Sequence, residues 1–138
     1  MIDSFTGDYR FLSNFYKWAV VFEGIIYPSV ECAFQAAKTT DVDLRIDFVE
    51  MTSAQAKHAG RRLKLRADWE QVKLGIMEQL LVSKFYAKPM CQKLMATGNQ
   101  QLVEGNDWRD TYWGVCDGVG ENHLGLLLMK VRDQLRTT

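Results

Sequence analysis

The chain has 138 residues, of which 47% are hydrophobic and 25% are charged, and both fractions are ordinary for a folded globular protein. Its 17 basic residues balance its 17 acidic residues, which argues against a long basic track for duplex nucleic acid but allows a local basic pocket. The length predicts one domain over residues 1–138.

The first part of the chain is predicted to hold a loop, a hairpin and a helix. Residues 8–16 mix aromatic and polar side chains without a clear period, and we expect a loop there. Residues 18–28 carry β-branched and aromatic side chains on both sides of a Glu-Gly pair, which indicates a β-hairpin. Ser29 is then a suitable N-cap for a helix that runs to about Lys38.

The middle of the chain is predicted to be helical. Residues 41–51 fit both an alternating strand and a helix, and we favour the helix. Ser53 is expected to open a short polar helix that ends near Gly60. Residues 68–86 have the clearest apolar stripe in the sequence and predict a long helix.

The last part is predicted to contain two more helices around an irregular segment. A helix over residues 89–97 should stop at Gly98. Residues 101–116 are expected to hold a short strand, a turn and a polar-aromatic stretch, after which Asn122 caps a final helix. The sum is an α+β domain, mostly α-helical, with a small antiparallel β element. No alternating βαβ pattern or phosphate-loop motif occurs, which argues against Rossmann and P-loop folds.

The cysteines and the apolar runs bear on the cellular compartment. Cys32, Cys91 and Cys116 are an odd number without a CxxC motif, which argues against a disulfide framework and a zinc site. They are interpreted as small apolar groups in a protein of a reducing compartment. No secretory leader is recognisable, and no apolar run approaches the roughly 20 residues of a membrane span. We expect a cytoplasmic protein that does not enter the membrane.

A first candidate site lies on the predicted helix after Ser29. Glu31, Gln35 and Lys38 fall within an arc of about 60° and form one polar stripe. The spacing is typical of a solvent-exposed edge with a Glu–Lys pair. It also fits a functional acid, amide and amine, because the opposite face is small and apolar and the helix N-terminus favours an ionised Glu31. The pattern leaves both interpretations open.

A second candidate site is the stretch over residues 104–114, which combines three acids, an amide, an arginine and three aromatic rings. One interpretation is an aromatic-rich edge of the core. The other is a pocket wall, in which Trp108 or Trp113 stacks on a planar base while Asp110 or Glu104 contacts a ribose hydroxyl.

Other polar groups carry weaker signals. Residues 10–16 place a Ser-Asn pair between aromatic rings, which fits either a turn or a ligand wall on which Asn14 bonds a base edge. The basic run over residues 61–66 is either a solvated face or a phosphate site. His58 and His123 are isolated and are interpreted as surface or capping residues.

Several stretches, in order along nearly the whole chain, resemble the YbiA-like, or NADAR, family. They span residues 11–15, 27–38, 65–73, 104–115 and 122–132. One departure is Cys32, at a position where many relatives are expected to carry His. This change leaves the polar stripe intact but sits directly beside Glu31.

The resemblance implies a YbiA-like fold and an N-glycosidase that needs no metal or redox cofactor. Relatives hydrolyse ribosylamino-pyrimidine phosphates of the early riboflavin pathway or remove ADP-ribose from guanine bases in nucleic acid. We therefore expect a nucleotide-like small molecule or an ADP-ribosylated base as the binding partner. The alternatives are a non-catalytic module that binds ADP-ribose or NAD, and a structural or assembly protein that keeps only the fold.

Breaking the bond between C1′ of a ribose and a base nitrogen builds positive charge on the sugar, which a carboxylate stabilises. We hypothesise that Glu31 is this carboxylate and that Asp110 is the second acidic group. Lys38 is predicted to contact a phosphate or to attack the opened sugar as an amine. The predicted substrate-binding residues are Asn14, Gln35, Glu104, Asn106, Trp108, Trp113 and Arg10. Phosphate contacts are expected from Arg10, Arg61, Arg62 and Lys64.

Overall fold

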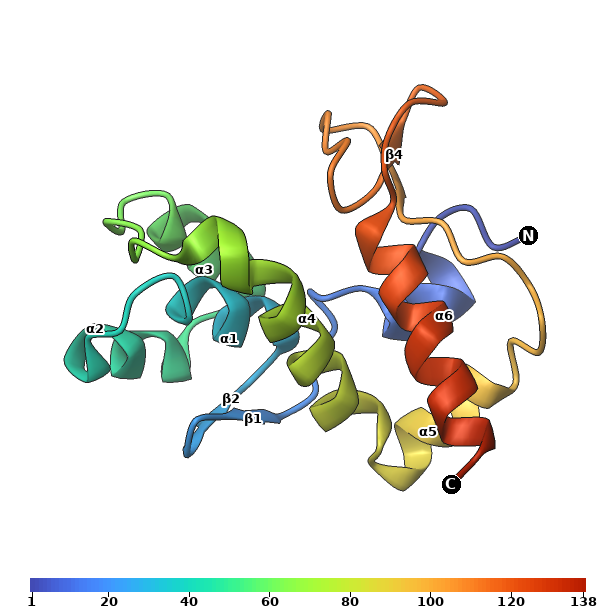
Figure 1. Cartoon of the computed structure of the whole chain (residues 1–138), viewed down its shortest axis with the longest axis horizontal. Helices are drawn as coiled ribbons and strands as arrows, with labels where there is room; N and C mark the ends of the chain where they lie inside the picture. Colours follow the sequence, from blue (N-terminus) through green and yellow to red (C-terminus); the bar gives the residue numbers. More distant parts are fainter. The chain divides into compact units, whose positions relative to one another are not determined.

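The computed structural model describes residues 1–138, which divide into two compact units (Figure 1). The central unit comprises residues 14–84, and the terminal unit comprises residues 1–13 together with residues 85–138. The terminal unit is thus built from both ends of the chain, and Ile2 forms a β-bridge with Leu102 inside it.

The central unit begins with the predicted hairpin. Strands β1 (Val20–Phe22) and β2 (Ile25–Tyr27) pair antiparallel, with the first residue of β1 opposite the last residue of β2. Glu23 and Gly24 connect them with φ angles of 47° and 83°. A two-residue turn of this kind needs positive φ at both positions, and Gly24 adopts it without steric cost, so the glycine is the residue that indicates the turn.

Helix α1 (Val30–Ala36) forms the core of the central unit. All of its residues are buried, and it packs against β1, β2, the 3₁₀ helix η2 (Asp47–Glu50) and α3 (Ser53–Gly60). Figure 1 shows α1 beside α3, as these contacts require.

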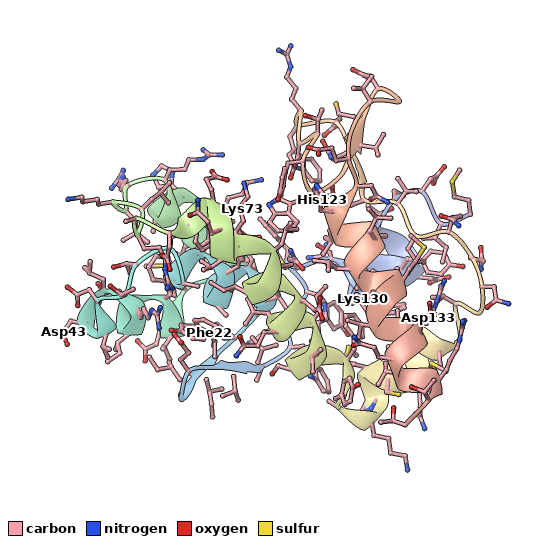
Figure 2. The ribbon with its side chains drawn as sticks, in the orientation of Figure 1. Phe22, Asp43, Lys73, His123, Lys130 and Asp133 are labelled. Carbon is pink, nitrogen blue, oxygen red and sulfur yellow. The ribbon has the colours of Figure 1, made fainter.

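The other helices of the central unit follow the sequence pattern. The helix favoured for residues 41–51 is present as α2 (Val42–Ile46), which continues into η2. The long helix is α4 (Trp69–Phe85). Arg45 on α2 is buried and places its guanidinium 5.2 Å from the ring centre of Phe22, which Figure 2 labels beside the hairpin.

The terminal unit contains two helices and a very short sheet. Helix α5 (Lys88–Met95) packs against α6 (His123–Arg136), and Gly98 follows α5 with a φ of 65°. Strands β3 (Gly105–Asn106) and β4 (Val115–Cys116) pair in parallel, an arrangement that the sequence did not indicate.

Two local predictions for the terminal unit are wrong. Part of the expected loop over residues 8–16 is a 3₁₀ helix, η1 (Gly7–Leu12), which packs against α5 and buries its last two residues. Asn122 precedes α6, but its side chain does not cap the helix. Instead, its Oδ1 accepts from the Glu104 N–H at 2.9 Å and its Nδ2 donates to the Leu102 carbonyl at 3.0 Å.

The predicted fold class is confirmed, because the chain is mostly helical and its hairpin is the small antiparallel element. The prediction of one domain stays a prediction. None of the helices combines the length and the apolar character needed to cross a bilayer.

Candidate active site

The polar stripe on α1 is buried. Glu31 is 8% exposed and Gln35 is 6% exposed, and Gln35 Nε2 donates to Glu31 Oε2 at 2.6 Å. Their spacing of four residues places the two side chains above one another on the helix. Since a solvent-exposed edge would not bury an acid and an amide, that interpretation of the stripe is wrong.

Several hydrogen bonds fix the turn of α1 that carries Glu31. The Glu31 N–H donates to the Asn14 carbonyl at 3.0 Å, which ties the helix start to the preceding loop. Ser53 Oγ donates to the Phe15 carbonyl at 2.9 Å and lies 2.8 Å from the N-cap oxygen, Ser29 Oγ. Groups held by such contacts lose little freedom when a ligand binds.

Lys38 extends the stripe beyond the end of α1 and is half-buried. Burial lowers the pKa of Lys38, the negative charge of Glu31 opposes this shift, and the positive charge of Arg61 adds to it. The lowered pKa makes the neutral, nucleophilic amine more accessible than in an ordinary lysine. The Lys38 carbonyl accepts from the Arg66 N–H at 2.8 Å, which holds the backbone here.

Two side-chain amide oxygens of the central unit are buried without a hydrogen-bond donor. They are Asn14 Oδ1 and Gln35 Oε1. The Asn14 Nδ2 group contacts only the Met77 sulfur, at 3.6 Å. Because buried acceptors almost always find a donor, an unused oxygen on Asn14 fits the predicted contact with a ligand N–H or O–H group.

The basic run near Lys38 is only partly neutralised. Arg66 pairs with Asp68 at 2.6 Å, and Arg62 lies 3.1 Å from His58. Arg61 is exposed, follows α3 directly and has no carboxylate partner. An unpaired guanidinium beside Lys38 is suited to a phosphate.

In the terminal unit, Asn106 organises the second predicted site. Its Nδ2 donates to Glu104 Oε2 at 3.0 Å and to the Asp110 carbonyl at 2.9 Å. Its Oδ1 accepts from the N–H groups of Asp110 and Trp108 at 3.1 and 3.3 Å. Asn106 therefore shapes the loop, and a substrate contact would have to share these bonds.

Asp110 also has a structural task. Its Oδ1 accepts from the N–H groups of Tyr112 and Trp113 at 3.1 and 2.9 Å, in the manner of a turn-forming aspartate. Its Oδ2 makes no bond within the protein, so one carboxylate oxygen stays available.

The indoles of this loop differ in exposure. Trp108 is 55% exposed, whereas Trp113 is half-buried with its ring centre 4.9 Å from that of Tyr112. The Tyr112 ring lies 4.4 Å from the imidazole of His123, which Figure 2 shows at the start of α6. His123 in turn pairs with Glu121 at 3.3 Å, so it is not isolated.

The structure thus places the predicted residues in two clusters. Within the central unit it brings together Asn14, Glu31, Gln35 and Lys38. Within the terminal unit it brings together Glu104, Asn106, Trp108, Asp110 and Trp113, while Arg10 is exposed on η1. No three His, Cys, Asp or Glu side chains are arranged to hold a metal ion.

Sequence reasoning missed two residues beside the α1 stripe. Ser53 was recognised only as a helix start, although its hydroxyl joins α3 to the start of α1. Gly60 was recognised only as a helix end, although it lies against the Gln35 amide. Their contacts join segments more than 20 residues apart, and no local pattern encodes such contacts.

Comparison with known proteins identifies the family of this chain. A family model described as the NADAR domain matches residues 4–136, so the chain belongs to the NADAR family. The chain is 39% identical over 137 residues to the N-glycosidase YbiA of Escherichia coli (strain K12), and the match covers 96% of this chain and 85% of that protein. The NMR structure of the E. coli protein YbiA matches it with a TM-score of 0.85 at 34% identity, over 99% of this chain and 88% of that one.

A second kind of relative is much longer than this chain. A riboflavin biosynthesis protein of Vibrio vulnificus (strain YJ016) is 34% identical over 134 residues. The match covers 94% of this chain but only 36% of that protein.

Proposed function

We propose that this chain is an N-glycosidase that hydrolyses the bond between a ribose and a nitrogenous base. Its substrate is a ribosyl-phosphate or ADP-ribosyl compound, such as a ribosylamino-pyrimidine phosphate or an ADP-ribosylated guanine. The observation that carries the proposal is the buried Glu31 carboxylate, bonded by Gln35 at 2.6 Å and followed on the same stripe by Lys38. The names of the YbiA relatives, which are N-glycosidases, support the reaction class.

Glu31 is proposed to stabilise the positive charge that develops at C1′. A carboxylate held in a water-poor place acts more strongly on such a charge than it would in bulk water. Its geometry is already fixed by Gln35 and by the backbone bond to Asn14, so little reorganisation is needed during the reaction.

Lys38 is proposed to act as an amine. In the ring-opened sugar, C1′ is doubly bonded to the nitrogen of the base. The neutral Lys38 amine adds to C1′, and both of its protons pass to that nitrogen as the bond from C1′ to the base breaks, so the base leaves as a free amine and the sugar stays on Lys38 as an imine. Water then hydrolyses the lysine imine and restores the free amine. The lowered pKa of Lys38 supports this role, because the attacking amine must be neutral.

The phosphate of the substrate is proposed to contact Arg61, the unpaired guanidinium next to Lys38. The predicted roles of Asp110, as the second acidic group, and of Trp108 and Trp113, as stacking partners of the base, rest on the polar-aromatic pattern of residues 104–114 and on the family resemblance. The effect of each alanine variant on turnover tests them separately.

The deciding experiment is a side-by-side assay of the purified chain. A ribosylamino-pyrimidine phosphate and an ADP-ribosylated guanosine are incubated with the protein, and chromatography measures the released base or amine. The proposal is supported if the wild-type protein releases the base or amine from either substrate and the Glu31→Gln variant does not. Tight binding of ADP-ribose with no release from either compound would make the chain a binding module instead.

A borohydride trap tests the role of Lys38. Reduction during turnover should convert the imine into a stable secondary amine, and mass spectrometry of a digest should find the added sugar on Lys38. Turnover without any trapped adduct would leave Lys38 as a phosphate contact.

A further inference from the structure

Gly60, the last residue of α3, lies against the side chain of Gln35. A Cβ atom at position 60 would lie 1.9 Å from Gln35 Oε1, 2.7 Å from its Cδ and 3.1 Å from its Cβ. Atoms that are not bonded do not approach so closely. The Gln35 amide therefore occupies the space that any side chain at position 60 would need.

The orientation of the Gln35 amide is defined by its surroundings. Nε2 donates to Glu31 Oε2 at 2.6 Å, whereas Oε1 is buried without a donor. Turning the amide over would place its oxygen against the carboxylate, where two acceptors repel each other. Gln35 is thus held between Glu31 on one side and the bare backbone of Gly60 on the other.

The backbone itself does not call for glycine at position 60. The φ angle of Gly60 is not in the left-handed region, and the residue is part of a regular helix. Alanine is preferred over glycine in such a position. The close approach of the Gln35 amide is the remaining reason for a residue without a side chain.

We propose that Gly60 and Gln35 are a positioning pair, in which the absent side chain of Gly60 lets the Gln35 amide aim the Glu31 carboxylate. The proposal rests on the N-glycosidase function proposed above. It assigns Gln35 to positioning rather than to substrate binding, and it adds a residue of α3 to the machinery that α1 carries.

The first test is the Gly60→Ala variant. Because the clash involves only a flexible side chain, the fold should survive while the Gln35 amide is displaced from Glu31. Loss of one hydrogen bond to a charged group should lower kcat by about 10- to 100-fold. KM should change little, so the loss should appear in kcat rather than in substrate binding.

Gly75 provides the matched control. It lies in the middle of α4, and a Cβ added there would meet nothing within 4 Å. Gly75→Ala should raise the melting temperature by about 2–4 °C and leave kcat and its pH profile unchanged. Wild-type kcat in a folded Gly60→Ala variant would overturn the proposal.

A double-mutant cycle shows whether Gly60 acts through Gln35. In the Gln35→Ala background the amide is gone, so adding Gly60→Ala should cause no further loss of kcat. If Gly60→Ala lowers kcat by the same factor in both backgrounds, its effect does not pass through Gln35 and the proposal fails.

A readout without substrate separates this proposal from the proposed function. The side-chain amide signal of Gln35 in a ¹H–¹⁵N NMR spectrum should respond to Glu31→Ala and to Gly60→Ala, but not to Gly75→Ala. A wild-type protein that cleaves no substrate would refute the N-glycosidase function, whereas an amide signal insensitive to Gly60→Ala would refute the positioning pair.

Discussion

Burial decides what Glu31 and Lys38 can do chemically. A carboxylate that is 8% exposed keeps its charge only where neighbours stabilise it, and the Gln35 amide provides such a contact at 2.6 Å. Burial lowers the pKa of Lys38, the negative charge of Glu31 raises it, and the positive charge of Arg61 lowers it further. These opposing influences act on one amine, so single substitutions should separate them.

Glu31→Gln should keep the fold and lower kcat by at least about 100-fold, because the amide is nearly isosteric but cannot stabilise the charge at C1′. Steady-state kinetics with the better substrate of the side-by-side assay measures the effect. Glu50→Gln, an exposed acid on η2, is the matched control and should behave as wild type. Near-wild-type turnover of Glu31→Gln would remove this residue from the mechanism.

The pH dependence of turnover should reflect Lys38. Only the neutral amine attacks, and burial lowers the pKa of Lys38 from its ordinary value of 10.5. We therefore expect kcat to rise with pH and to level off below pH 10.5, as measured between pH 6 and 10. Lys38→Arg should lose turnover by about 100-fold or more, since a guanidinium stays charged. Full activity of Lys38→Arg would contradict the amine role. The control is Lys88→Arg, the same substitution at an exposed lysine of α5, which should leave kcat unchanged.

At the scale of elements, α1 is a short helix whose stability comes from its surroundings. A helix of seven residues is too short to be stable alone, so its caps and packing determine its position. Ser29 Oγ accepts from the Cys32 N–H at 3.1 Å, and Ser53 Oγ lies 2.8 Å away from it. The start of α3 thereby supports the start of α1.

Ser29→Ala should destabilise the protein by about 1–2 kcal/mol, because it removes an N-cap and the partner of the half-buried Ser53 hydroxyl. Urea unfolding followed by circular dichroism measures the change. The exposed Thr40 makes no side-chain hydrogen bond, so Thr40→Ala should leave the midpoint unchanged. An unaltered midpoint in Ser29→Ala would show that the cap does not stabilise α1.

At the scale of the whole molecule, the most unusual charged group is Lys84 on α4. Its side chain is fully buried, and its Nζ lies 5.4 Å from the centre of the Tyr16 ring. Burial lowers the pKa of Lys84 to about 7. The unfolded chain holds this proton up to about 10.5, so between pH 7 and 10.5 the unfolded state binds more protons and stability rises with pH.

Lys84→Met should remove this pH dependence. The wild-type free energy of unfolding is expected to gain about 2 kcal/mol between pH 7 and pH 9 relative to the variant. Denaturant titrations at both pH values measure the difference, with the exposed Lys88→Met as the control. Identical pH dependence in wild type and Lys84→Met would mean that Lys84 keeps an ordinary pKa.

The apolar pattern of α4 allowed its length to be predicted but not the place of Lys84. Position 84 follows Leu80 by one helical turn and therefore lies on the apolar stripe. A lysine there is normally expected to reach solvent with its flexible stem. Only the surrounding structure determines that it is enclosed.

The sequence alone determined the fold class, the hairpin with its Glu-Gly turn, the helix after Ser29 and the polar stripe from Glu31 to Lys38. These features depend on residues a few positions apart, where propensity, capping and periodicity act.

Tertiary structure decided the rest. The parallel pairing of β3 with β4, the hydrogen bonds of Asn122, the burial of Glu31 and the contact of Gly60 with Gln35 all join segments far apart in sequence. Local patterns are silent about such contacts, because burial and close approach arise only when distant elements pack together.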